Sequence, residues 1–556
     1  MNKTFIALVA ALLASPALAD TLIYNINGIQ VSADGKLQHF TGLVVGNDGK
    51  VAQIVRRDTD LKRPIEHEID GHGRTLLPGL IDAHGHVTAL GTAAMTLQLS
   101  GSSSLADVQQ RLRAYASAHR DKLWIIGFGW NQELWPDKSF PTAADLDAVV
   151  SDRPVVLERV DGHAIVANSA ALRAAGVTAA TRDLAGGKVE RDAKGNPTGL
   201  FVDKARSLVE RAIPPQTATD EDQALDLAQE QLLSLGVTAV GSMSTSMDDW
   251  QAFRRAGETG RLRVRLMSYM NAPEAAQANA APTPWLYGDR LRLIGVKLFA
   301  DGALGSRGAW LKQPYADKPD TRGLPRRTDA EFMAMADAAA ARGFQLATHA
   351  IGDAANAQVI GAYEQLHRKY PGNRRWRIEH FQIADPIDIP RLAPSGIIAS
   401  MQPTHQTSDR LMAEKRLGPN RLGGAYAWNT IRTTGAHLAF GSDFPVESPN
   451  PFPGLAAAIS RQDMNGQPPG GWRPEERVSF ETALAGFTRE AAYASFAEDR
   501  VGALEPDKWA DFILVDRDPT KVDAQQLART EVLETWVAGQ KIWARALSAA
   551  ATERGK

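Results

Sequence analysis

The chain has 556 residues, a formal net charge of −2, 23% charged residues and 44% hydrophobic residues. This length exceeds what one small core can organise, so more than one structural unit is expected. The near-zero charge, without long basic or acidic runs, argues against a nucleic-acid partner. Cysteine is absent, which excludes disulfides, thiol nucleophiles and cysteine-ligated metals.

The N-terminus has the pattern of a secretory signal. Lys3 precedes an apolar run over residues 5–13, and small residues follow at Ala17 and Ala19. The run is shorter than the ~20 residues of a membrane-spanning helix, which favours a cleaved signal over residues 1–19 rather than a retained anchor. We therefore expect a periplasmic or secreted protein with no membrane association after cleavage.

Short β-like runs occur near both ends of the chain. A turn signal, Asn47-Asp-Gly-Lys50, separates two of them. Strands at both ends, with a large region between them, predict one β-sandwich built from residues 20–76 and 501–556. The runs themselves are residues 21–24, 42–45, 51–55, 511–515 and 532–543.

The region between the ends, residues 77–500, alternates strand-like and helix-like segments. Eight such strands predict an α/β fold of the (β/α)8 TIM-barrel type. About 150 residues separate the first two strands, and a connection of that length needs structure of its own. We therefore predict an inserted subdomain over about 88–235, near the barrel mouth. The predicted strands are residues 77–84, 237–243, 262–270, 293–299, 344–349, 376–380, 396–401 and 437–441.

Polar side chains lie at or just after the ends of several predicted strands, where a barrel carries its active site. His84 and His86 are two positions apart, so both leave a strand on one face and can share a metal ion. A single histidine or aspartate at a strand end is commonly structural, whereas a lysine inside an apolar strand is rarely buried unpaired. The further candidates on separate strands are Lys297, His349, His380 and Asp443.

Other residues are weaker candidates for substrate binding. Trp130 could line a pocket or fill the core of the insert, and His163 could face substrate or pack in a turn. Arg307 could hold an anionic group or lie on the surface. Gln402 and His405 follow the seventh strand near the mouth. Glu379 precedes a predicted ligand and should point the opposite way, so it is interpreted as structural.

These motifs together resemble those of the amidohydrolase superfamily, and more narrowly the YtcJ-like and N-substituted formamide deformylase branch, amidohydrolase family 3. The resemblance covers nearly all of the chain after residue 19. It implies a distorted (β/α)8 barrel with a β-sandwich from both termini, and metal-dependent hydrolysis of C–N bonds. The motifs that carry it are residues 78–86, 129–132, 161–163, 297–307, 348–353, 378–380, 401–405 and 441–445.

The resemblance also implies a role for each candidate at the strand ends. His84, His86 and Asp443 would bind a buried divalent metal, and His349 and His380 a more exposed one. Lys297 would be carboxylated and bridge both ions. Zinc is favoured by four imidazoles and oxygen ligands, with iron and manganese left open. A single-metal site with Lys297 as an ion-pair partner is the alternative.

The expected reaction is attack of a metal-bound hydroxide on an amide, an N-formyl group or a related small C–N substrate, with Asp443 as general base and acid. A deaminase, lactonase or carbamate hydrolase would use the same site. A non-catalytic binding protein on a barrel scaffold is the alternative from another class. The insert and the loops after strands seven and eight would select the small-molecule substrate, and a homo-oligomer is left open.

Overall fold

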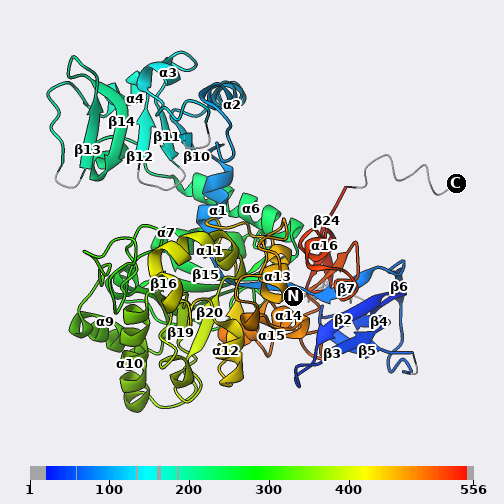
Figure 1. Ribbon diagram of the computed structural model, residues 1–556. Coiled ribbons are helices and arrows are strands. Elements are labelled where there is room, and N and C mark those ends of the chain that lie inside the picture. Colours follow the sequence, from blue (N-terminus) through cyan, green and yellow to red (C-terminus); the bar gives the residue numbers. More distant parts are fainter. Residues whose placement is uncertain (1–19, 58, 133–134, 160–163, 185–186, 547–556) are drawn as a thin grey trace, which may run out of the picture. The chain divides into compact units, whose positions relative to one another are not determined.

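The computed structural model describes residues 20–57, 59–132, 135–159, 164–184 and 187–546 (Figure 1). The chain divides into two compact units. One contains the residues up to His86 together with those from Gln229 onward, and the other spans Val87–Ala228.

The first unit contains a sheet of eight parallel strands in the order β21-β20-β19-β18-β17-β16-β15-β8. Each strand pairs with its neighbour in sequence, as a (β/α)8 barrel requires. The α/β fold with a distorted TIM barrel is therefore confirmed. The strands are β8 Leu80–Gly85, β15 Val237–Thr245, β16 Arg265–Asn271, β17 Leu291–Phe299, β18 Gln345–Ala350, β19 Arg377–His380, β20 Ile398–Met401 and β21 Leu438–Phe440.

Helices follow the barrel strands and cover the outside of the sheet (Figure 1). Thr328 illustrates how they begin: its side chain accepts from the backbone of Glu331, whose carboxylate accepts in return, a capping box that starts α9. The barrel helices include α7 Met247–Glu258, α8 Ala272–Gln277, α9 Asp329–Ala341, α10 Asp353–Lys369, α11 Pro403–Leu417, α12 Trp428–Thr433, α13 Pro451–Ser460, α14 Phe480–Gly486 and α15 Arg489–Ala494.

The first and last barrel strands are joined by hydrogen bonds just beyond β21 rather than by a regular ladder. The Asp443 backbone N–H donates to the His84 carbonyl at 2.7 Å. The buried Asp82 carboxylate accepts from the Ser442 hydroxyl at 2.6 Å, and from the backbone N–H groups of Ser442 and His84. These contacts bring the ends of β8 and β21 together and nearly close the barrel.

The two termini form the additional sheet region of the first unit. One sheet has the order β5-β4-β1-β6 and the other the order β24-β23-β22-β7-β2-β3. Side chains of both sheets, including Leu43, Phe512 and Trp536, share one buried cluster. The strands are β1 Thr21–Tyr24, β2 Asn27–Val31, β3 Leu37–Phe40, β4 Gly42–Val45, β5 Val51–Val55, β6 His67–Asp70, β7 Thr75–Pro78, β22 Phe512–Val515, β23 Val532–Val537 and β24 Gln540–Ala544.

The predicted start of the first barrel strand is corrected. Residues 77 and 78 belong to β7, which pairs antiparallel with β22 in the terminal sheet. The barrel strand β8 begins only at Leu80, after Gly79. Both strands are fully buried, and the apolar run of residues 76–81 crosses from the end of β7 to the start of β8, so one run covered parts of two different sheets.

The second unit has a six-stranded sheet of its own, in the order β13-β14-β12-β11-β10-β9. Trp130, Leu146 and Leu157 belong to its buried core. Its elements include α1 Val87–Ala94, β9 Leu97–Gln98, α2 Leu105–Ala118, β10 Ile125–Trp130, α3 Ala143–Asp147, β11 Val155–Arg159, β12 Ala164–Ala167, α4 Ser169–Ala174, β13 Gly187–Arg191 and β14 Pro197–Asp203. The last helix, α6 Ala218–Ser234, leads back to the barrel.

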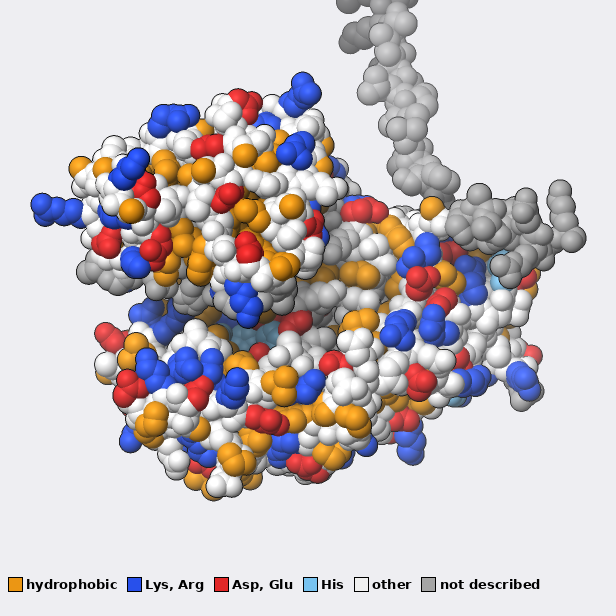
Figure 2. Space-filling view, turned by 45° about the horizontal axis from the view of Figure 1, so that its top comes forward, with side chains coloured by type: hydrophobic (Ala, Val, Ile, Leu, Met, Phe, Trp, Pro, Cys, Tyr) orange, Lys and Arg blue, Asp and Glu red, His pale blue; other side chains and the backbone are white. Residues whose placement is uncertain are grey.

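The surface is mixed in charge. On the face shown in Figure 2, Lys and Arg side chains are interspersed with Asp and Glu, without an extended patch of one sign among the described residues. This agrees with the small net charge of the chain. Among the described residues, no helix has the length and apolarity needed to span a bilayer.

Candidate metal centre

The barrel places the main candidate residues at the carboxyl ends of its strands. His84 lies in β8, Lys297 in β17, His349 in β18 and His380 at the end of β19. Parallel pairing aligns the ends of neighbouring strands: Lys297 lies opposite Ala347 of the next strand, and His349 lies opposite Glu379. Side chains far apart in sequence therefore meet at one end of the barrel.

The Asp443 carboxylate is the centre of this group. Its Oδ1 lies 3.0 Å from His86 Nε2 and 3.3 Å from His84 Nε2, and its Oδ2 lies 4.0 Å from His380 Nδ1. Lys297 Nζ lies 3.3 Å from His84 Nε2. The ring centroids of His349 and His380 are 4.7 Å apart. The structure thus brings together all six residues predicted from the strand ends.

Two of these residues have backbone angles that L-amino acids rarely adopt. His380 has φ 75° and Asp443 has φ 60°, both in the left-handed region. Such a residue breaks the alternation of side chains along a strand, so its side chain leaves in a direction that a regular strand would not give. Both side chains are directed into the shared site as a result.

The charge state of the group suits metal binding. Burial lowers the pKa of His349 to about 3 and also lowers the pKa of His84 and His380, so these imidazoles are neutral. Burial opposes ionisation of Asp443, but the neighbouring His84 and His86 outweigh it and hold its pKa well below the usual range. Neutral imidazoles and an ionised carboxylate are the forms that bind metal.

Lys297 is the one cationic side chain among these residues. It is 2% exposed, and burial lowers the pKa of its ammonium to about 8. An appreciable fraction is therefore uncharged near neutral pH, and an uncharged amine is the form that can react at nitrogen.

The histidines of the His84–His86 pair are both anchored through Nδ1. His84 Nδ1 lies 2.7 Å from the Glu379 carboxylate, and His86 Nδ1 lies 3.2 Å from the Met243 carbonyl. Because these partners are acceptors, each ring carries a proton on Nδ1, and its Nε2, which contacts Asp443, would offer a lone pair once an ion replaced that hydrogen bond. Arg377 holds Glu379 in turn with two hydrogen bonds.

Glu379 is the functional residue that the sequence interpretation misplaced. It points toward His84, because the left-handed backbone at His380 breaks the alternation on which the opposite direction rested. A usable signal was present in the sequence, since Arg377 and Glu379 are oppositely charged residues two positions apart in a predicted barrel strand, where buried charges need a partner.

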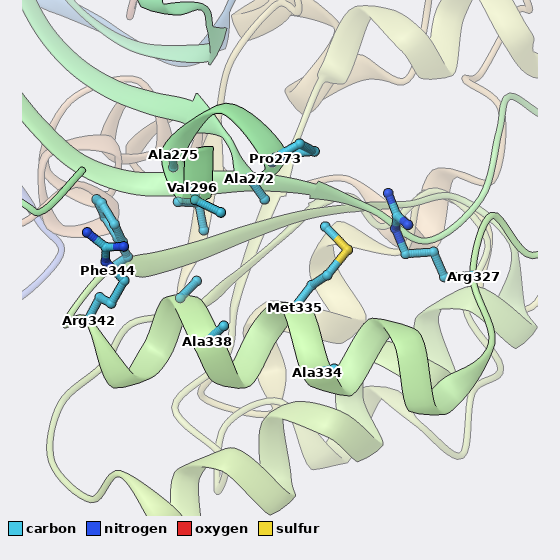
Figure 3. Close-up of a pocket in the computed structure, with 12 residues that line it drawn as sticks. Ala272, Pro273, Ala275, Val296, Arg327, Ala334, Met335, Ala338, Arg342 and Phe344 are labelled. Carbon is cyan, nitrogen blue, oxygen red and sulfur yellow. The ribbon is translucent and has the colours of Figure 1, made fainter. Parts of the chain in front are cut away.

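The site opens into a cavity of about 380 Å³. Its walls combine the candidate ligands with apolar side chains such as Leu304, Met412 and Val446. A larger cavity of about 490 Å³ lies between α8, β17 and α9, where Met335 and Pro273 line it (Figure 3). That second cavity has no carboxylate or imidazole in its lining, so the chemistry points to the first.

The weaker candidates have varied positions. The Gln402 Oε1 atom lies 2.8 Å from His380 Nδ1, so Gln402 orients a predicted ligand. His405 lines the cavity. The Arg307 guanidinium forms an ion pair with Asp317 at 2.9 Å.

Of the two roles considered for Trp130, a place in a pocket or in the core of the insert, the structure gives the second. Its ring is fully buried in the core of the second unit, and its Nε1 donates to the Leu157 carbonyl at 2.8 Å. An indole enclosed in this way fills a core rather than presenting a face to a ligand. His163 lies outside the described residues.

The donor atoms fit a divalent metal. One ligand atom each from His84, His86 and Asp443 lies within 4.8 Å of the others, and the same holds for His380, His405 and Asp443. Imidazole nitrogens with a carboxylate form the donor set of zinc and related ions.

Comparison with known proteins identifies the chain. The profile of the amidohydrolase family (Amidohydro_3) matches residues 67–542. The chain belongs to this family. It is 33% identical over 490 residues to YtcJ of Bacillus subtilis, covering 86% of this chain and 91% of the relative. It is 27% identical over 543 residues to the N-substituted formamide deformylase of Arthrobacter pascens, covering 94% and 98%.

Solved structures agree with this assignment. A metal-dependent hydrolase from Pyrococcus horikoshii OT3 has a TM-score of 0.76 and 27% identity, covering 91% of this chain and 99% of that one. The predicted YtcJ-like branch of amidohydrolase family 3 is therefore confirmed. This amidohydrolase is a metal-dependent hydrolase.

Proposed function

We propose that this amidohydrolase cleaves the C–N bond of a small amide or N-formyl compound, with Asp443 as the proton carrier. The observation that supports this most strongly is the convergence of four imidazoles, Lys297 and Asp443 at one end of the barrel, where all of them except the buried His84 line one cavity. The name of the Arthrobacter pascens relative, an N-substituted formamide deformylase, supports the choice of bond.

His84, His86 and Asp443 would hold one divalent ion, and His349 and His380 a second, with zinc favoured for both. Such ions supply a Lewis acid for the substrate carbonyl and lower the pKa of water. Lys297 would react as the free amine with carbon dioxide, forming an N–C bond and releasing a proton. The resulting carbamate offers oxygen ligands where an ammonium offers none.

Asp443 would move the proton. Its carboxylate lies on the cavity wall and is ionised, so it can accept a proton from the attacking water. The same proton then passes to the nitrogen of the broken C–N bond, and the amine leaves neutral. The balance is one water and one amide consumed, one acid and one amine formed.

The test is amine release from N-formyl and N-acyl amines by the zinc-loaded protein. Asp443→Asn keeps the shape of the side chain but cannot accept the proton, so kcat should fall by about 10²–10⁴-fold. Metal content measured on the same sample separates loss of the proton carrier from loss of an ion. Near-normal turnover by Asp443→Asn would exclude the assigned role.

The state of Lys297 is tested separately. Protein prepared with isotope-labelled bicarbonate should give a carbamate resonance that is absent from Lys297→Met. An unmodified Lys297 ammonium in the active, metal-loaded protein would show that Lys297 does not bridge two ions. It would favour a single-metal site with Lys297 as an ion-pair partner.

A further inference from the structure

One wall of the cavity carries two carboxylates that the reaction proposed above does not use. Helix α11 directs His405 and Asp409 into the cavity, one turn apart on the same face. Glu447, from the segment after β21, also lines the cavity and accepts from the Ser408 hydroxyl of α11.

Asp409 is only half satisfied. Its Oδ2 accepts from the Tyr426 hydroxyl at 2.8 Å, whereas no donor among the described residues reaches its Oδ1. The position is partly enclosed, and burial raises the pKa of the Asp409 carboxyl. A carboxylate held by one oxygen, with the other facing a cavity, is free to accept from a ligand.

His405 gives a second, independent sign of a ligand. Its side chain is 9% exposed, and its Nδ1 lies 3.1 Å from the Gln382 amide nitrogen. Its Nε2 is buried without a hydrogen-bond partner among the described residues, 3.8 Å from Asp443 Oδ2. A buried polar atom left unpaired is unfavourable. Because Nδ1 faces an amide donor, the ring proton sits on Nε2, so an acceptor atom of the substrate rather than a metal ion is expected beside it.

The remaining lining residues leave these carboxylates without cationic partners. Lys297 is the one cationic Lys or Arg side chain among the lining residues, and it lies at the deep end beside His84. Arg307, for which anion binding was one of two alternatives, is paired with Asp317. An anionic group near α11 would therefore meet two carboxylates, whereas a cationic group would be matched.

We propose that Asp409 and Glu447 form a subsite for a positively charged nitrogen of the substrate. The preferred substrates are then N-formyl or N-acyl amines that carry a second, cationic amino group a few bonds from the scissile nitrogen. His405 Nε2 hydrogen-bonds to the substrate between the two ends. This inference rests on the proposed C–N hydrolysis and adds the charge class of its substrate.

The test compares three substrates of equal length: an N-formyl diaminoalkane, an N-formyl alkylamine and an N-formyl amino acid with a terminal carboxylate. The wild-type kcat/KM should rank cation over neutral over anion, with the cation favoured over the neutral compound by about tenfold. Asp409→Asn/Glu447→Gln should bring the cation-to-neutral ratio close to one. A ratio taken within one variant cancels any general loss of activity.

Asp499→Asn is the matched control, because Asp499 is a surface carboxylate that does not line the cavity. It should leave the cation-to-neutral ratio unchanged. The inference is overturned if the wild type prefers the anionic or the neutral substrate, or if Asp409→Asn/Glu447→Gln keeps the wild-type ratio.

Calorimetric binding of the free diamine and the free alkylamine gives a readout that needs no turnover. The wild type should bind the diamine more tightly, and Asp409→Asn/Glu447→Gln should lose that difference. If no substrate is hydrolysed but this difference is present, the proposed C–N hydrolysis fails and the subsite stands. Equal binding of both amines by the wild type would refute the subsite.

Discussion

Glu379 determines how His84 meets the metal centre. Its carboxylate is fully buried, lies 2.7 Å from His84 Nδ1 and is held by Arg377. The ion pair and the histidine contact outweigh the effect of burial and lower the pKa of Glu379, so the carboxylate is charged. A charged acceptor at Nδ1 fixes the ring orientation and makes Nε2 a stronger ligand.

Replacing Glu379 by Gln should therefore weaken metal binding without removing a ligand. Carboxylates that support a metal-bound histidine typically contribute 10–100-fold in affinity, so a loss of about that size is expected. The measurement is metal retained during titration with a chelator. Glu490→Gln is the control, since Glu490 contacts His437 Nδ1 at the same 2.7 Å away from the site. Unchanged metal affinity in Glu379→Gln would contradict the role.

Residue patterns in the sequence were enough to find the six central candidates, because strand ends in a parallel barrel meet at one place. They were not enough for Glu379, whose direction depends on the left-handed backbone of His380. Gln402 was placed near the mouth, but its contact with His380 Nδ1 depends on where α11 begins. Such features follow from dihedral angles and packing, which no residue spacing encodes.

At the scale of elements, all eight barrel strands overlap segments predicted from the sequence, because these segments alternate with helix-like stretches in the order that a barrel requires. The strands of the two terminal sheets were harder to predict from the sequence. Strands β2, β3 and β6 have partly exposed or mixed sequences, and their partners lie elsewhere in the chain. The boundary between β7 and β8 was hidden because the end of β7 and the start of β8 are both apolar, so only the change of pairing partner at Gly79 separates them.

The closure between β8 and β21 gives a prediction at this scale. Asp82→Ala would leave three donors, the N–H groups of Ser442 and His84 and the Ser442 hydroxyl, without their acceptor. Each unpaired buried donor costs about 1–3 kcal/mol, so unfolding by denaturant should shift to clearly lower concentration. Asp82→Asn keeps one acceptor oxygen and should lose less. If Asp82→Ala unfolds at the same denaturant concentration as the wild type, these contacts do not stabilise the closure of the barrel.

At the scale of the whole molecule, the metal centre joins elements from both ends of the barrel sequence. Its candidate ligands come from five strands or the segments that follow them, between His84 and Asp443. A metal bound by residues so far apart in sequence binds the folded chain much better than the unfolded one. The metal should therefore stabilise the fold as a whole.

Removal of the metal with a chelator should lower the unfolding temperature seen by calorimetry. Binding to the folded state alone contributes about 4 kcal/mol at a free metal concentration a thousand times Kd. Zinc added back should restore both the temperature and the activity. If the stripped protein unfolds at the same temperature as the loaded protein, the ions do not connect these strands.

Export is a further proposal at this scale, with removal of residues 1–19. The carboxylate of Asp20, the residue after the predicted cleavage site, is bound to Arg63 at 2.7 Å and to the Asn47 backbone N–H at 3.1 Å. Protein recovered from the periplasm or medium of the expressing bacterium should begin at Asp20, as measured by mass spectrometry of the intact chain. Recovery of full-length chain from the cytoplasm alone would contradict export.

The left-handed angles of His380 and Asp443 have a consequence for how this molecule can evolve. A non-glycine residue held in that region costs about 1–3 kcal/mol, which the rest of the barrel must offset. Both positions would suit glycine better, yet glycine would remove a candidate ligand and the proposed proton carrier. Selection for robustness alone would therefore erode these positions first, and their persistence in a lineage would record continued demand for catalysis rather than for the fold.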